Sequence, residues 1–243
     1  MSDRVCVVFA AGEYYGRVDA GVASRGAFVV AADGGLDHAR AAGVSPDVVV
    51  GDFDSLRGAL PSDAGRTVAL PPMKDDPDLL SALKIGWSQG CRLFHVYGAL
   101  GGRVDHSVSA IRLTALVAHH GGVMFLHGDG QVVTSVCDGA LSFPAHEAEP
   151  GGMVSVFSHS DVSVGVDEPG LRYELRDGVL RGDMVQGVSN EFRPGVPASV
   201  GVREGTLTVV FPASAPLPEV TWRHAFAGDL GALDTSVSSL LVR

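Results

Sequence analysis

Residues 27–55 read AFVVAADGGLDHARAAGVSPDVVVGDFDS, and they show the architecture of the chain more clearly than any other stretch. Two continuous apolar runs, Ala27–Ala32 and Val48–Val50, are typical of strands that are buried on both faces. Between them, Leu36–Ala42 follows a short helix pattern, and Gly43 suits the left-handed end of that helix. The order strand, helix, strand predicts a parallel pair within an α/β sheet.

The same alternation extends through the first half of the chain. Apolar runs predict further strands at Val5–Ala11, Val68–Leu70, Leu93–Tyr97, Val123–Leu126 and Gln131–Val136. One helix is expected to start at Pro77 with Asp76 as its cap, and another carries an apolar stripe from Val104 to Ala115. Residues 1–137 are therefore expected to form an α/β domain, with a mainly parallel, Rossmann-like sheet and helices on both faces.

The helix signal disappears in the second half. Residues 138–152 are rich in Gly, Pro, Ala and Glu, which suits a linker. Residues 153–225 are expected to form an antiparallel β-sandwich, and the tail 226–243 has no assigned role. The strands expected there are Val154–Phe157, Val162–Val166, Tyr173–Leu175, Val179–Leu180, Ser199–Val202 and Thr206–Phe211.

Composition narrows the classes of function. The 243 residues carry a formal net charge of -10, which argues against binding to a nucleic-acid backbone but not against a nucleotide with its metal ion. The longest early apolar run is far shorter than the roughly 20 residues that a membrane span needs, so no membrane association is expected. The widely spaced cysteines (Cys6, Cys91, Cys137) suggest buried thiols in a reducing compartment, and we expect a cytoplasmic protein.

Four acidic stretches suggest where the chemistry lies. They contain Asp33, the pair Asp52 and Asp54, the group Asp75, Asp76 and Asp78, and Asp105. Carboxylates at the carboxyl ends of parallel strands converge on the crevice where an open α/β sheet binds its ligand. Because clustered carboxylates repel one another, a hard cation bridging to a polyphosphate is the natural partner. The pattern predicts metal-dependent phosphoryl chemistry.

Each of these motifs also has an ordinary structural interpretation. Strand alternation points Asp52 and Asp54 to the same side, yet an Asp followed by Ser after a strand often makes only a turn. Lys74 either contacts a phosphate or simply offsets the charge of its neighbours. Arg103 follows two glycines and offers a planar donor fork that suits phosphate. The chain has no Gly-x-x-x-x-Gly-Lys-Ser/Thr motif and is therefore not a P-loop enzyme.

Two segments of the second half stand out from the strands around them. Gly170-Leu171-Arg172-Tyr173 offers an aromatic ring that can stack on a flat or cationic heterocycle. The segment 187–191 contains Ser189 and Asn190, which can hydrogen-bond the edge of such a ring. Taken alone, either segment is more often a structural turn.

Together and in this order, the motifs resemble those of the thiamin pyrophosphokinase family. The landmarks run from about residue 27 to residue 211: Ala-Asp-Gly-Gly, Gly-Asp-Phe-Asp-Ser, Lys-Asp-x-x-Asp, Gly-Gly-Arg-x-Asp-His, Gly-Leu-Arg-Tyr and Ser-Asn-Glu. The resemblance implies a homodimer in which an α/β nucleotide-binding catalytic domain is joined to a thiamin-binding β-sandwich. It also implies Mg²⁺-dependent transfer of the pyrophosphoryl group of ATP to thiamin, with release of AMP.

The resemblance also assigns roles to residues. Asp52, Asp54 and Asp78 correspond to metal-associated carboxylates, and these three together with Asp75 are the expected catalytic group. The nucleotide and phosphate shell would be Asp33, Gly34, Lys74, Arg103 and Asp105. Thiamin contacts would be Tyr173, Ser189 and Asn190, with the sandwich of one subunit completing the site of the other.

Two departures from the family pattern leave alternatives open. Pro77 stands where the family usually has Thr, and Leu80 stands where it has Glu. The substitution at Leu80 lends some weight to a non-catalytic regulator that binds thiamin or a nucleotide. A phosphatase with Asp52 as nucleophile is a further alternative, although that class carries Asp-x-Asp on its first strand and has no all-β second half.

Overall fold

The computed structural model describes residues 4–16, 18, 21, 23, 26–53, 59 and 66–238. By the contacts between its residues, the chain divides into two units, which are described one at a time. The first unit contains Met1–Ala110 and Asp229–Arg243, and the second contains Ile111–Gly228. The division falls within helix α4, Val104–His119.

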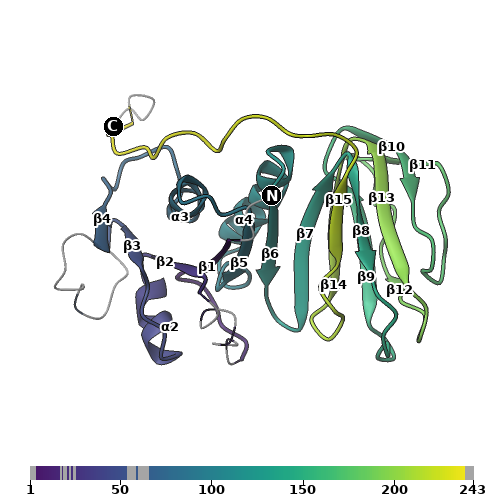
Figure 1. Cartoon of the computed structure of the whole chain (residues 1–243), viewed down its shortest axis with the longest axis horizontal. Coiled ribbons are helices and arrows are strands. Elements are labelled where there is room, and N and C mark those ends of the chain that lie inside the picture. The colour runs from purple at the N-terminus through teal and green to yellow at the C-terminus, as the bar shows by residue number, and fades with distance from the viewer. Residues whose placement is uncertain are drawn as a thin grey trace. The chain divides into compact units, whose positions relative to one another are not determined.

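The first unit is built on parallel strands. These pair in the order β5-β1-β2-β3-β4. Their bounds are β1 Val5–Phe9, β2 Phe28–Ala32, β3 Val48–Gly51, β4 Thr67–Ala69 and β5 Leu93–Tyr97. All five residues of β2 are buried, as the continuous apolar run predicts. Helices α2, Gly35–Ala41, and α3, Asp78–Ser88, lie on opposite faces of these strands (Figure 1).

The second unit consists mainly of antiparallel strands (Figure 1). One set pairs in the order β6-β7-β14-β9-β12. Its bounds are β6 Val123–His127, β7 Gln131–Cys137, β9 Met153–Ser158, β12 Asn190–Glu191 and β14 Thr206–Pro212. A separate five-stranded sheet has the order β11-β10-β13-β8-β15. Its bounds are β8 Gly139–Phe143, β10 Val162–Asp167, β11 Gly178–Arg181, β13 Ala198–Glu204 and β15 Glu219–Trp222.

The structure confirms a mixed α/β chain with a parallel sheet region and a separate antiparallel sheet, but it differs from the expectation at three places. Strand β7 pairs antiparallel with β6 and β14, so it does not extend a parallel sheet. Strand β8 lies inside the expected linker, because Leu141 and Phe143 point into the core on alternate positions. Residues 173–175 form no strand, since the backbone groups of Tyr173 bond to the side chain of Asn190 instead.

Two simpler expectations can be checked directly. All three cysteines are free and buried, in agreement with the sequence. Among the described residues, no helix has the length and apolar character needed to cross a membrane. The boundaries between a nucleotide-binding and a thiamin-binding domain concern function, and they stay a proposal.

Candidate functional site

Three carboxylates come together in the first unit. One oxygen each from Asp33, Asp52 and Asp78 lies within 4.8 Å of the other two, an arrangement that can hold a metal ion. Asp33 follows β2, Asp52 follows β3, and Asp78 begins α3. The carboxyl ends of adjacent parallel strands meet at one edge of a sheet, and this explains why residues so far apart in sequence converge.

The backbone around Asp33 is built to bring these strand ends close together. Asp33 has a φ of 50°, in the left-handed region, and its N–H donates to the carbonyl of Val50 over 2.8 Å. Gly35 packs so tightly against the backbone of Phe9 that any side chain there would collide with the carbonyl. The glycine of the Ala-Asp-Gly-Gly motif therefore allows close approach of β1 and the start of α2.

Lys74 is the cation that belongs to this cluster. Its side chain is only 6% exposed, and Nζ lies 2.9 Å from Oδ1 of Asp78. Burial raises the pKa of Asp78, the bond from Lys74 opposes this, and the charges of Asp52 and Asp33 raise the pKa further. The cluster thus holds more negative charge than Lys74 offsets, and a cation would relieve the repulsion.

The loop before α3 differs from the expectation at one residue. The N-cap position of α3 is Pro77, with no side-chain capping bond, so the expectation of Asp76 as the cap is wrong. Asp76 instead forms an ion pair with Lys84 at 2.5 Å, in which both side chains are largely buried. This pair ties the loop to the second turn of α3. Leu80, in place of the family Glu, is half-buried on the same helix.

The C-terminal segment also contacts this loop, which the sequence did not indicate. The N–H of Ser238 donates to the carbonyl of Met73 over 2.8 Å. The carboxylate of Asp234 accepts a hydrogen bond from the N–H of Asp75. Ser238 and Leu230 are each only 7% exposed. Part of the tail is therefore packed against the loop that carries Lys74 and Asp78.

Arg103 and Asp105 form an exposed pair near the start of α4. Nη2 of Arg103 lies 2.6 Å from Oδ2 of Asp105, and the two side chains are 71% and 64% exposed. Pairing with Arg103 lowers the pKa of Asp105. Because both side chains face solvent, little holds the guanidinium in this orientation, and an anionic ligand can compete for it.

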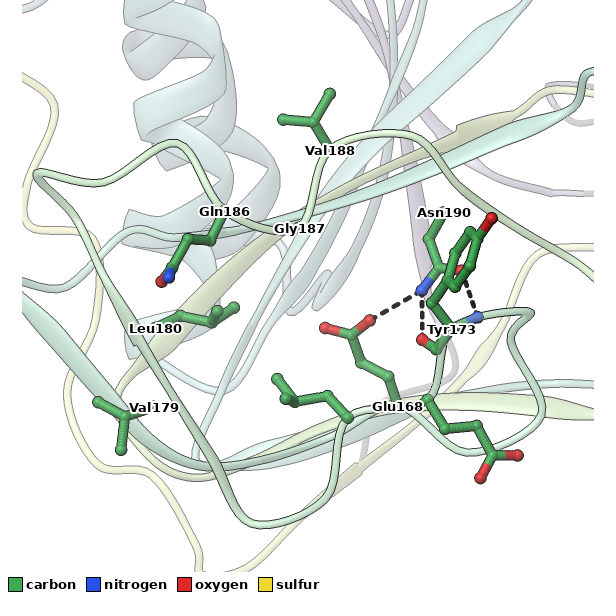
Figure 2. A pocket seen from close by; sticks show the side chains of 10 residues that line it. Glu168, Tyr173, Val179, Leu180, Gln186, Gly187, Val188 and Asn190 are labelled. Atoms are coloured by element: carbon green, nitrogen blue, oxygen red, sulfur yellow. Dashed lines mark hydrogen bonds between the residues drawn. The ribbon is translucent and has the colours of Figure 1, made fainter.

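The second unit contains a cavity of about 400 Å³. Its lining includes Tyr173 and Asn190, two of the expected thiamin contacts, and one residue that the sequence analysis missed, Glu168. Figure 2 shows the carboxylate of Glu168 beside the side-chain amide of Asn190, at the side of the cavity where Tyr173 lies. Tyr173 is 64% exposed, with the Arg172 guanidinium 5.6 Å from its ring centroid.

The comparisons with known proteins point to one family. Residues 21–126 match the model of the thiamin pyrophosphokinase catalytic domain, a segment that includes the whole acidic cluster. These residues match the thiamin pyrophosphokinase family. No curated protein sequence matches it.

Solved structures of thiamin pyrophosphokinases are similar to this chain in fold. The thiamine pyrophosphokinase of Bacillus subtilis has a TM-score of 0.75 at 20% identity, over 86% of this chain and 99% of that one. The thiamin pyrophosphokinase of Geobacillus thermodenitrificans has a TM-score of 0.69 at 21% identity, over 86% of this chain and 98% of that one. The thiamin pyrophosphokinase of Candida albicans has a TM-score of 0.67 at 14% identity, over 86% of this chain and 89% of that one.

The match to the thiamin pyrophosphokinase catalytic domain indicates an enzyme, a thiamine diphosphokinase, and favours neither the phosphatase nor the regulator. Of the expected metal carboxylates, the structure brings Asp52 and Asp78 together and adds Asp33, which was expected in the nucleotide shell. Asp54 lies outside the described residues. Asp75 is exposed and Gly34, at the N-cap of α2, is buried.

Of the expected thiamin contacts, Ser189 is exposed, has a φ of 61° and donates its N–H to Oγ of Ser155. No sequence motif marks Glu168, because a single Glu before Pro-Gly is typical of a turn.

Proposed function

We propose that this chain transfers the pyrophosphoryl group of ATP to the hydroxyl of thiamin, with Mg²⁺ held by the acidic cluster. The observation that carries the proposal is the meeting of the Asp33, Asp52 and Asp78 oxygens within 4.8 Å, inside the segment that matches the catalytic-domain model. Carboxylate oxygens are the ligands that Mg²⁺ prefers, and the ion usually takes only one or two of them alongside substrate phosphates.

The donor set fits an octahedral Mg²⁺. Ligands at about 2.1 Å from the ion lie about 3–4 Å from one another, within the spacing of the cluster. Asp52 and Asp78 would hold the ion, with Asp33 or Asp54 as a further ligand. When bound, Mg²⁺ would neutralise phosphate charge during the transfer.

The remaining residues of the first unit would position the nucleotide. Lys74 already lies beside the cluster and would exchange its bond to Asp78 for one to a phosphate oxygen. Arg103 would leave Asp105 in the same way. Because this ion pair is exposed to solvent, breaking it costs little free energy. Asp75, Gly34 and Asp105 would complete the phosphate and nucleotide shell around these cations.

The acceptor would bind in the second unit, which we propose as a β-sandwich working with a Rossmann-like nucleotide domain. Its cavity of about 400 Å³ falls within the size range of small-molecule sites, and Tyr173 offers an aromatic face. We propose that the active form is a cytoplasmic homodimer, in which the acceptor cavity of one subunit faces the acidic cluster of the other.

The deciding experiment measures AMP formation with ATP, thiamin and Mg²⁺, each omitted in turn. A thiamin pyrophosphokinase forms AMP and thiamin diphosphate only when all three are present. A phosphatase would release inorganic phosphate without thiamin, and a regulator would form no product. Either of these two results would refute the proposal.

A further inference from the structure

The side chain of Asn190 has no hydrogen-bonding capacity left for a ligand. Its Oδ1 accepts from the N–H of Tyr173 at 3.0 Å and from its own neighbour Glu191 at 2.9 Å. Its Nδ2 donates to the carbonyl of Tyr173 at 2.8 Å and to Oε2 of Glu168 at 3.2 Å. A primary amide has two acceptor sites and two donor hydrogens, and all four are used. A direct contact between Asn190 and thiamin would break one of these bonds.

Glu168 is the polar group that Asn190 holds at the cavity. It is only 3% exposed, yet it lines the cavity, and Figure 2 shows its second oxygen directed away from Asn190 toward the interior of the cavity. A buried carboxyl costs free energy unless its oxygens find partners. Burial raises the pKa of Glu168, and the bond from Asn190 opposes that rise.

The rest of the lining combines apolar side chains with the polar Glu174 and Gln186. Leu175, Leu180 and Val188 contribute hydrocarbon, and Tyr173 contributes its aromatic ring. A buried carboxyl beside apolar side chains selects ligands by the hydrogen-bond pattern of one edge. An aminopyrimidine presents an amino donor beside a ring-nitrogen acceptor. Nδ2 of Asn190 occupies Oε2 of Glu168, so the second carboxylate oxygen is the acceptor that faces the cavity and can accept from the amino group.

We infer that Glu168 is the specificity-determining residue for the acceptor and reads the aminopyrimidine edge of thiamin, while Asn190 is a positioning residue that orients Glu168. This inference rests on the proposed function. It assigns the recognition to a residue outside the family motifs, and it changes the role expected of Asn190 from contact to support.

The experiment compares thiamin with its 4-oxo analogue, in which the amino donor is replaced by an acceptor. Calorimetric titration measures the affinity of each ligand without turnover, for the wild type, for Glu168→Gln and for the control Glu204→Gln. Glu204 is an exposed carboxylate at the end of β13 and does not line the cavity. Thermal unfolding checks that all three proteins are folded.

We expect the wild type and Glu204→Gln to prefer thiamin over the 4-oxo analogue by about tenfold or more. In Glu168→Gln the amide oxygen can still accept from Asn190, but an N–H group then faces the cavity. Its thiamin affinity should fall about tenfold or more, and its preference should shrink to within about threefold, with ATP affinity unchanged. Asn190→Asp should reduce the same preference, although its side chain would not touch the ligand.

A wild type that binds both compounds equally overturns the inference, and that measurement needs no variant to fold. A Glu168→Gln protein that keeps the wild-type preference overturns it as well. In both cases, thiamin-dependent AMP formation by the wild type would leave the proposed function standing. A wild type that neither binds thiamin nor forms AMP refutes the inference and the proposed function together.

Discussion

Gly51 lies directly against Asp33: a Cβ atom added to Gly51 would be 3.1 Å from both Cα and Cβ of Asp33. Asp33 follows β2 and Gly51 ends the adjacent strand β3, and Asp33 and Asp52 both belong to the acidic cluster. The absence of a side chain at Gly51 therefore sets how closely two of the carboxylates approach.

Gly51→Ala should push Asp33 away from the cluster by a few tenths of an ångström. We expect turnover to fall by roughly tenfold and the Mg²⁺ concentration for half-maximal activity to rise, because catalytic geometry is sensitive to small displacements. Steady-state kinetics over a Mg²⁺ series measures both. Gly16→Ala is the matched control, since a Cβ there has no neighbour within 4 Å. Equal kinetics for the two variants would show that the close approach does not matter.

Asp52→Asn should abolish turnover without unfolding the protein, because it removes one negative charge at the metal site at nearly constant shape. The loss should be at least about a hundredfold, given that even residues supporting a metal ligand contribute 10- to 100-fold. Asp129→Asn, in an exposed turn, controls for the loss of one charge. Near-normal activity of Asp52→Asn at saturating Mg²⁺ would contradict the metal role.

Tyr173→Ala should weaken thiamin binding by roughly 1–3 kcal/mol, because the ring can stack on the pyrimidine or on the cationic thiazolium. ATP affinity should change little. Tyr173→Phe should lose much less thiamin affinity, since the aromatic ring rather than the hydroxyl supplies the contact. Titration with each ligand separates these effects, and equal weakening of ATP and thiamin would argue against an acceptor site at Tyr173.

Mixing two variants tests whether the site is shared between subunits. Asp52→Asn disables the metal site, and Tyr173→Ala disables the acceptor site at low thiamin. Random exchange of subunits gives half mixed dimers with one intact site each, so activity should recover to about a quarter of the wild type. If confirmed subunit exchange brings no activity above the average of the two parents, each site lies within one subunit.

Asp234→Ala tests the contact of the tail with the loop before α3. Its carboxylate accepts from the N–H of Asp75, close to Lys74 and Asp78. Losing this bond should loosen the loop and raise the KM for ATP a few-fold, by about 1 kcal/mol or less. Asp229→Ala is the control in the same tail, because Asp229 bonds only locally to Gly231. Identical kinetics for both variants would limit the tail to a stabilising role.

Local sequence patterns predicted much of the fold. Continuous apolar runs such as Phe28–Ala32 form buried parallel strands, because both faces of a covered sheet exclude water. The strand pattern also failed where side chains replaced strand pairing, as at Tyr173, whose backbone bonds to Asn190. Strand β8 was not predicted, because the Gly, Pro, Ala and Glu content of residues 138–152 is typical of a linker. The strand forms because alternate residues, Leu141 and Phe143, are buried.

The residue types that carry the chemistry follow from the sequence alone: the acidic motifs after strands, the basic residues near them, and the order of landmarks that resembles the thiamin pyrophosphokinase family. The folded chain brings Asp33 together with Asp52 and Asp78, and it buries Glu168 at a cavity, where Asn190 donates a hydrogen bond to it. The physical reason is that motifs depend on local backbone and side-chain chemistry. Convergence and burial depend instead on strand pairing and packing between residues far apart in the chain.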